Sequence, residues 1–283
     1  MGLITDYEAY ANGYEPVPLA AAPAGVTGAE AGSASVLRRR STRPSRRAVI
    51  YVHCQGDAFV PSELAAWYVD RGFHFYVADL RAVGGAGQPG AAGSDGGAAG
   101  ELAECFACLD AAVMRLRDDD GIDAVVVAAH AAGAVIAALW SHARRGSQPV
   151  DALVLASPEF SPGGRRLART AAAAEPDQRQ GWPLLAGAQR RLRRGLDIAC
   201  PVLVMCPADG WDAPGGPGGL LGWRLLFGGR ATTRLGAHVT WMKLDGGQPG
   251  AALPAPEGRK SFFDELGRWL GAYLSGQVRD QLL

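Results

Sequence analysis

The chain has 283 residues, 48% of them apolar, and its 28 basic and 28 acidic residues give a formal net charge of zero. This length and composition allow one large α/β domain with an insertion, and the balanced charge argues against nucleic acid as a partner. No apolar run reaches the roughly 18–20 residues that span a bilayer, and residues 1–18 lack the basic and apolar segments of a secretory signal. We therefore expect a cytoplasmic protein without a membrane span.

Strands and helices are predicted to alternate along most of the chain. Residues 14–40 hold two weak strand candidates that look like an edge hairpin, and residues 83–100 form a glycine-rich loop. Elsewhere, β-branched apolar runs alternate with segments of helical periodicity. The expected strands are 46–53, 73–80, 122–130, 151–157, 201–209 and 238–246, and the expected helices are 61–72, 101–119, 132–145 and 259–274.

This alternation predicts an α/β protein with a mainly parallel sheet that is covered by helices on both faces. The Arg-, Ala- and Pro-rich segment 158–198 interrupts the alternation, and we interpret it as a helical cap over one end of the sheet. The core would then consist of residues 1–157 and 199–283. Ligands of such sheets bind at the carboxyl ends of the strands.

The five cysteines are scattered and odd in number, which argues against a disulfide framework. Cys105 and Cys108 form a Cys-x-x-Cys pair, but no second pair of Cys or His lies near it to complete a metal site. We interpret the two cysteines as small residues on one helix face. The sequence therefore predicts neither a metal nor a cofactor.

Residues 124–140, AVVVAAHAAGAVIAALW, pass from an apolar run through a tight turn of small residues into an alanine-rich helix. This pattern is typical of a strand–nucleophile–helix elbow, in which a sharp turn exposes the nucleophile. The position after His130 should hold the nucleophile, and here it is Ala131.

The order of these segments resembles the α/β-hydrolase fold, and more narrowly the monoacylglycerol-lipase-like and serine-aminopeptidase-like hydrolases of bacteria. The resemblance covers roughly residues 46–157 and 195–274. Its matching segments include RRAVIYVHCQGD, DRGFHFYVADLRAVG, AVVVAAHAAG, DALVLASPEF, PVLVMCPAD and HVTWMKLDGG. It implies a G-x-S-x-G serine where this chain has Ala129-His130-Ala131-Ala132-Gly133. A methyl group cannot attack a carbonyl carbon.

The resemblance also implies a catalytic histidine after the last strand. That position falls on Pro249, or on Gln248 with a slip of one residue, and neither side chain is a general base. The acid should follow the strand at 201–209, where Asp209 and Asp212 are candidates, but a carboxylate without its histidine has no role in a triad. A laboratory Ser→Ala exchange would explain Ala131 but not Pro249. We therefore expect serine hydrolase activity to be absent.

The oxyanion loop of the family corresponds to His53-Cys54-Gln55-Gly56-Asp57. An oxyanion hole uses backbone N–H groups, here those of Gln55 and Ala132, so it can survive these substitutions. Cys54 is either a displaced nucleophile, which would need a base and a lowered pKa, or a small buried residue.

A glycine-rich motif and a basic cluster could each indicate a binding site, but both have simpler interpretations. The G-x-G-x-x-G match at 85–90 is not followed directly by a helix, so we do not interpret it as a dinucleotide site. The cluster QRRLRRG at 189–195 is either a solvated helix face or a surface for a carrier protein or an anionic ligand.

Three hypotheses follow for the function. The first is a non-hydrolytic protein of secondary metabolism that binds a hydrophobic acyl- or polyketide-like molecule and promotes a cyclisation, elimination or rearrangement. The second is a scaffold or receptor-like protein, and the third is an ester or lipid hydrolase inactivated at Ala131. A homodimer stays open in all three. The first assigns polar roles to His53, Asp57, His130, Asp209 and Gln248, and pocket positions to Cys54, Trp182 and Trp211.

Overall fold

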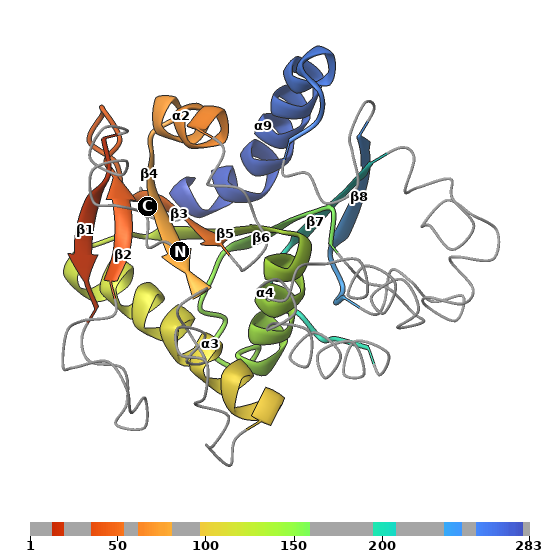
Figure 1. Ribbon diagram of the computed structural model, residues 1–283. Coiled ribbons are helices and arrows are strands. Elements are labelled where there is room, and N and C mark those ends of the chain that lie inside the picture. Colours follow the sequence, from red (N-terminus) through yellow and green to blue (C-terminus); the bar gives the residue numbers. More distant parts are fainter. Residues whose placement is uncertain are drawn as a thin grey trace, which may run out of the picture.

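An eight-stranded sheet forms the centre of the computed structural model (Figure 1). The structure describes residues 13–19, 35–53, 62–80, 97–158, 195–207, 235–244 and 253–279. The strands lie in the order β1-β2-β4-β3-β5-β6-β7-β8. They are β1 (Glu15–Pro18), β2 (Ser35–Arg39), β3 (Arg47–His53), β4 (Phe73–Asp79), β5 (Ala124–His130), β6 (Ala152–Ala156), β7 (Val202–Pro207) and β8 (Val239–Leu244).

The sheet confirms the predicted mainly parallel arrangement. Strands β3 to β8 pair in parallel, whereas β1 and β2 form the expected antiparallel hairpin at one edge, and β2 runs antiparallel to β4. All seven residues of β5 are buried. A parallel strand covered on both faces reads as a continuous apolar run rather than an alternating one, which explains the sequence AVVVAAH.

Helices cover both faces of the sheet, as Figure 1 shows. They are α2 (Ser62–Asp70), α3 (Gly97–Met114), η2 (Arg115–Asp119), α4 (Ala131–Ala143) and α9 (Pro256–Arg279). Alternate residues of each strand point to opposite faces. Val127 and Ala129 of β5 therefore join the apolar cluster beneath α3 and α4, while Val126 and Ala128 join the cluster beneath α2 and α9.

Two helices, α3 and α9, differ most from their predicted bounds. Helix α3 begins at Gly97 and so includes the end of the predicted glycine loop, and it ends at Met114, where the π-helical turn η2 continues the chain. Alanines at 98 and 99 favour the helical conformation in this first turn, whereas the glycines at 97 and 100 disfavour it. Helix α9 begins at Pro256, where the fixed φ of proline suits a first helical position. None of the described helices is long and apolar enough to cross a membrane.

The predicted cap, 158–198, lies almost entirely outside the described residues and stays a prediction. The described chain resumes at Gly195, and Leu196 then forms an isolated parallel bridge with Leu235. Gly236, next to this bridge, has a φ of +110°. A Cβ at Gly236 would collide with the carbonyl oxygen of Ile198, so only glycine fits the backbone there.

We predict that Gly236→Ala destabilises the protein by at least about 2 kcal/mol, because the methyl group meets both a steric clash and an unfavourable φ. Urea unfolding followed by circular dichroism measures this change. Gly146→Ala is the matched control, since a Cβ at Gly146 has open space around it. The control should change stability by less than about 0.5 kcal/mol. Equal effects of the two substitutions would contradict the prediction.

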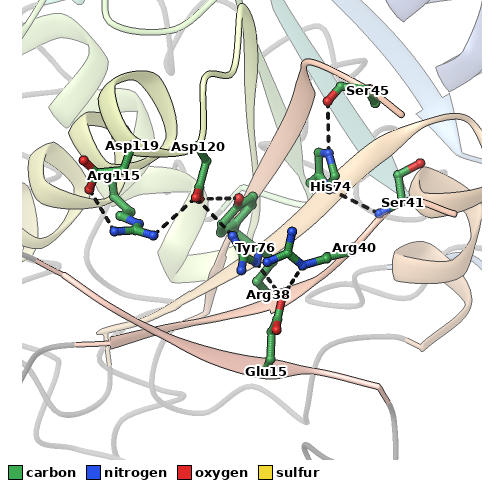
Figure 2. A network of polar contacts seen from close by, with 10 residues as sticks. All are labelled: Glu15, Arg38, Arg40, Ser41, Ser45, His74, Tyr76, Arg115, Asp119 and Asp120. Carbon is green, nitrogen blue, oxygen red and sulfur yellow. Dashed lines mark hydrogen bonds and ion pairs between the residues drawn. The ribbon is translucent and has the colours of Figure 1, made fainter. Parts of the chain in front are cut away.

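A polar network fastens the edge hairpin to the body of the sheet (Figure 2). Arg38 of β2 contacts Glu15 of β1 at 2.8 Å and Asp120, which follows η2, at 3.1 Å. Tyr76 of β4 donates a hydrogen bond of 2.7 Å to Asp120, and Arg115 approaches the same carboxylate at 3.3 Å. The Asp120 side chain is only 12% exposed. Its carboxylate contacts β2 through Arg38 and β4 through Tyr76, and so links two strands to the end of the α3 segment.

Asp120→Asn should lower the free energy of unfolding by roughly 1.5–3 kcal/mol, because charge-assisted hydrogen bonds to a largely buried carboxylate are lost. Asp119→Asn serves as the control, since Asp119 is 54% exposed and, among the described residues, pairs with Arg115 of the same helical segment. We expect a loss below about 0.5 kcal/mol for the control. Thermal unfolding of both variants tests the difference. The interpretation of the network fails if Asp119→Asn costs as much as Asp120→Asn.

Candidate functional site

The predicted elbow lies at the junction of β5 and α4. Strand β5 ends at His130, whose backbone is extended with φ −133° and ψ 163°, and helix α4 begins at the next residue. Ala131 has a φ of +47°, in the left-handed region. An alanine there costs roughly 1–2 kcal/mol relative to a right-handed backbone. The chain therefore retains the strained turn of a nucleophile elbow and carries a methyl group at its tip.

Small residues allow the elbow to form. Ala129 and Gly133 lie two residues before and after Ala131, and both are buried. Helix α4 packs against both β5 and β6. Larger side chains at these two positions would push the helix away from the strands, because protein interiors are close-packed. The turn is thus supported by the buried elements that it connects.

The elbow offers backbone N–H groups as hydrogen-bond donors. The first N–H groups of a helix have no acceptor within the helix, and they carry the positive end of its dipole. His130, the N-cap residue, makes no side-chain hydrogen bond to them. Ala131 is 7% exposed and Ala132 is half-buried. The Ala132 N–H is therefore placed at a helix start that suits a negatively charged oxygen.

Three titratable residues end neighbouring strands at the carboxyl edge. His53 ends β3, Asp79 ends β4 and His130 ends β5. His53 is the register partner of Asp79, and Val52, one residue earlier, is paired with Ala129. The sequence pattern predicted His53 and His130 as site residues but did not indicate Asp79. The signal for Asp79 was available, because its strand ends on a polar residue at the same edge.

His130 is 4% exposed and lies in the layer between the sheet and the helices α2 and α9. Its Nδ1 atom is 2.5 Å from the hydroxyl oxygen of Tyr51, and the two rings stack at 5.8 Å with an interplanar angle of 27°. Tyr51 also stacks on Phe75 at 5.9 Å. The imidazole is thus held beneath the elbow by aromatic neighbours.

A second strained residue lies beside the elbow. Ser157 directly follows β6 and has a φ of +44°. Because Ala156 is the register partner of His130, Ser157 follows its strand at the same level as Ala131 follows β5. The Ser157 N–H donates a hydrogen bond of 2.7 Å to the Met205 carbonyl oxygen. No sequence pattern indicated this turn, since serine has no special preference for the left-handed region.

Several predicted site residues lie outside the described residues, so their roles stay predictions. They are Cys54, Gln55, Asp57, Trp182, Asp209, Trp211, Gln248 and Pro249. For His53, the structure describes the backbone position at the end of β3. Within the described ranges, no group of His, Cys, Asp and Glu could hold a metal ion.

Cys105 and Cys108 lie on α3, and neither forms a disulfide bond. Burial, together with the nearby negative charge of Asp79, raises the pKa of Cys108 to about 11. The Cys108 thiol is therefore protonated at neutral pH and a poor nucleophile. This agrees with the interpretation of the pair as small residues on a helix face.

Comparison with known proteins identifies the family. A family model described as serine aminopeptidase, S33, matches residues 43–200, which is more than half of the chain. The chain therefore belongs to this family of α/β-hydrolases. A comparison with curated protein sequences gave no match.

Solved structures show the same fold at low sequence identity. A soluble variant of monoglyceride lipase from Saccharomyces cerevisiae, in complex with a substrate analogue, has a TM-score of 0.60 and 11% identity, covering 90% of this chain and 99% of that one. An esterase from Pyrococcus furiosus has a TM-score of 0.60 and 12% identity, with coverage of 96% and 95%. A monoacylglycerol lipase from Paleococcus ferrophilus has a TM-score of 0.54 and 18% identity, with coverage of 84% and 99%.

The left-handed backbone at the elbow predicts opposite responses to glycine at two adjacent alanines. Ala131→Gly should change the free energy of unfolding by less than about 0.5 kcal/mol, because relief of strain offsets the lost methyl burial. Ala132→Gly should cost about 1 kcal/mol, since position 132 is helical. Chemical unfolding of both variants measures the contrast. An equal loss at both positions would mean that Ala131 has an ordinary helical backbone.

Proposed function

We propose that this chain carries an esterase- or lipase-type site that binds an apolar ester, and that serine-dependent cleavage is blocked at Ala131. The observation that carries the proposal is the left-handed elbow at a residue with no nucleophilic atom. A strained backbone persists only where the surrounding structure holds it in place. Here the surrounding structure is that of the serine aminopeptidase, S33, family.

The N–H groups at the start of α4 support binding of an ester or its tetrahedral analogue. In acyl transfer, donors of this kind stabilise the negative oxygen that develops on the attacked carbonyl. They need no nucleophile in order to bind an oxygen atom. The polar strand ends His53 and Asp79 lie at the same edge of the sheet, where parallel sheets place their ligands.

The solved structures support an ester or lipid ligand better than the polyketide-like ligand of the first hypothesis. The similar structures are esterases and monoacylglycerol lipases. They support an ester or lipid ligand, and they give no support to a cyclisation, elimination or rearrangement in secondary metabolism. The scaffold hypothesis makes a different demand, because it does not require a small-molecule site.

Isothermal titration calorimetry with a tetrahedral ester analogue tests this binding. The probe is an octylphosphonate monoester, and 1-octanol is the control with the same alkyl chain. We expect the phosphonate to bind at least about tenfold more tightly than the alcohol, because its charged oxygen accepts hydrogen bonds from the elbow. Equal affinities for the phosphonate and the alcohol would show that the elbow N–H groups do not bind the charged oxygen. If neither compound binds, the scaffold hypothesis is favoured.

A second version of the proposal assigns the inactivation to position 131 alone. The match to the serine aminopeptidase family and the retained elbow favour it. In this version the rest of the hydrolytic machinery is intact. In the first version the base is lost as well, because Pro249 stands where the family has its histidine. Restoring the serine distinguishes the two.

We predict that Ala131→Ser alone does not restore hydrolysis of p-nitrophenyl butyrate and does not react with a fluorophosphonate probe. Loss of the triad histidine lowers kcat by about 10⁶-fold in a serine hydrolase even when the serine is present. The double variant Ala131→Ser with Pro249→His is the matched positive control. Substantial turnover or labelling of the single variant would establish the second version instead.

A further inference from the structure

A small cavity lies beneath the elbow, between the sheet and the helices α2 and α9. The centre of a water molecule can occupy about 10 Å³ of it. Apolar side chains form most of its wall, including Leu64 of α2, Met205 of β7, and Phe262 and Leu266 of α9. Three polar side chains also line it: Tyr51, Tyr68 and His130.

The hydroxyl group of Tyr68 has no hydrogen-bond partner among the described residues, although the side chain is fully buried. Its ring is packed edge-on against Trp67 at 5.0 Å and Phe73 at 5.5 Å, so it cannot turn towards solvent. Burial raises the pKa of Tyr68, so the phenol stays protonated. A buried hydroxyl without a partner is costly, and native proteins usually satisfy such a group with protein or with an ordered water molecule.

We propose that this cavity binds one water molecule, which connects the Tyr68 hydroxyl to the His130–Tyr51 pair and makes His130 a positioning residue for the elbow. The size fits, because a buried water needs on the order of 10–15 Å³ of such space. The chemistry fits as well, since a buried water needs between two and four polar partners, and three polar side chains line this cavity. The apolar remainder of the wall excludes a larger polar ligand.

The connection reaches the elbow through His130. This residue is the last of β5, and its extended backbone leads directly into the left-handed Ala131. Tyr51 holds the imidazole from the neighbouring strand β3. A water molecule in the cavity would connect the His130–Tyr51 pair to helix α2 through a hydrogen bond with Tyr68. The backbone direction at Ala131 and Ala132 would then depend on the hydrogen bonds of the preceding residue, His130.

The sign of the stability change in Tyr68→Phe tests the water site. Removing a hydroxyl that has no partner would leave the stability unchanged or raise it, whereas removing one that binds a buried water should lower it. We expect the equilibrium constant of unfolding to rise by at least about threefold. A Tyr68→Phe variant of unchanged or higher stability would overturn the proposal.

A double-mutant cycle tests the connection. If one water links the two tyrosines, the effects of Tyr68→Phe and Tyr51→Phe on the unfolding constant should deviate from independence by at least about twofold. Tyr76→Phe is the matched control, because the Tyr76 hydroxyl bonds Asp120 away from the cavity. The combined effect of Tyr76→Phe and Tyr68→Phe on the unfolding constant should equal the product of their separate effects. Independent effects of Tyr51→Phe and Tyr68→Phe would contradict the shared water.

A spectroscopic measurement separates positioning from general stability. In ¹H–¹⁵N spectra, Tyr51→Phe and Tyr68→Phe should each shift the backbone amide resonances of Ala131 and Ala132 and the ring nitrogen resonances of His130. Tyr76→Phe should leave all of these in place even if it lowers stability. Unchanged amide resonances in the first two variants would show that His130 does not position the elbow. This test needs no ligand, so it can fail independently of the proposed function.

Discussion

The left-handed backbone of Ala131 is the constraint on which the site depends. It joins a strand with seven buried residues to a helix that packs on β3, β5 and β6, and no loop separates the strand from the helix. Neither element can shift without opening the core, so the turn between them is sharp and fixed. The strain of roughly 1–2 kcal/mol is small beside the burial of β5 and α4. The geometry of the elbow therefore survives without the nucleophile for which it is suited.

This separation of scaffold from chemistry explains the function that we propose. The helix start, its N–H groups and the converging strand ends come from backbone packing, and they do not require a serine. The nucleophile and the base are single side chains, and each can be lost while the fold is kept. We therefore propose that this chain of the serine aminopeptidase family binds an ester that it does not cleave. His130 and Tyr51 fit this account because they lie in the supporting layer beneath the elbow.

The sequence predicted much of the core because its signals are local. Continuous β-branched runs marked the parallel strands, and the small residues around Ala131 marked the elbow correctly. Other features depend on contacts between distant segments. The pairing of Tyr51 with His130, the pairing of Arg38 with Asp120 and the left-handed Ser157 arise only when strands become neighbours. Periodicity also could not place the start of α3, because the helix begins among glycines, which disfavour a helix.

A crystal structure of the natural chain with an octylphosphonate monoester tests the central claim most directly. The account predicts a left-handed backbone at Ala131, with a phosphonate oxygen about 3 Å from the Ala132 nitrogen and the alkyl chain at the carboxyl edge of the sheet. A phosphonate bound elsewhere, or an ordinary helical backbone at Ala131, would contradict it.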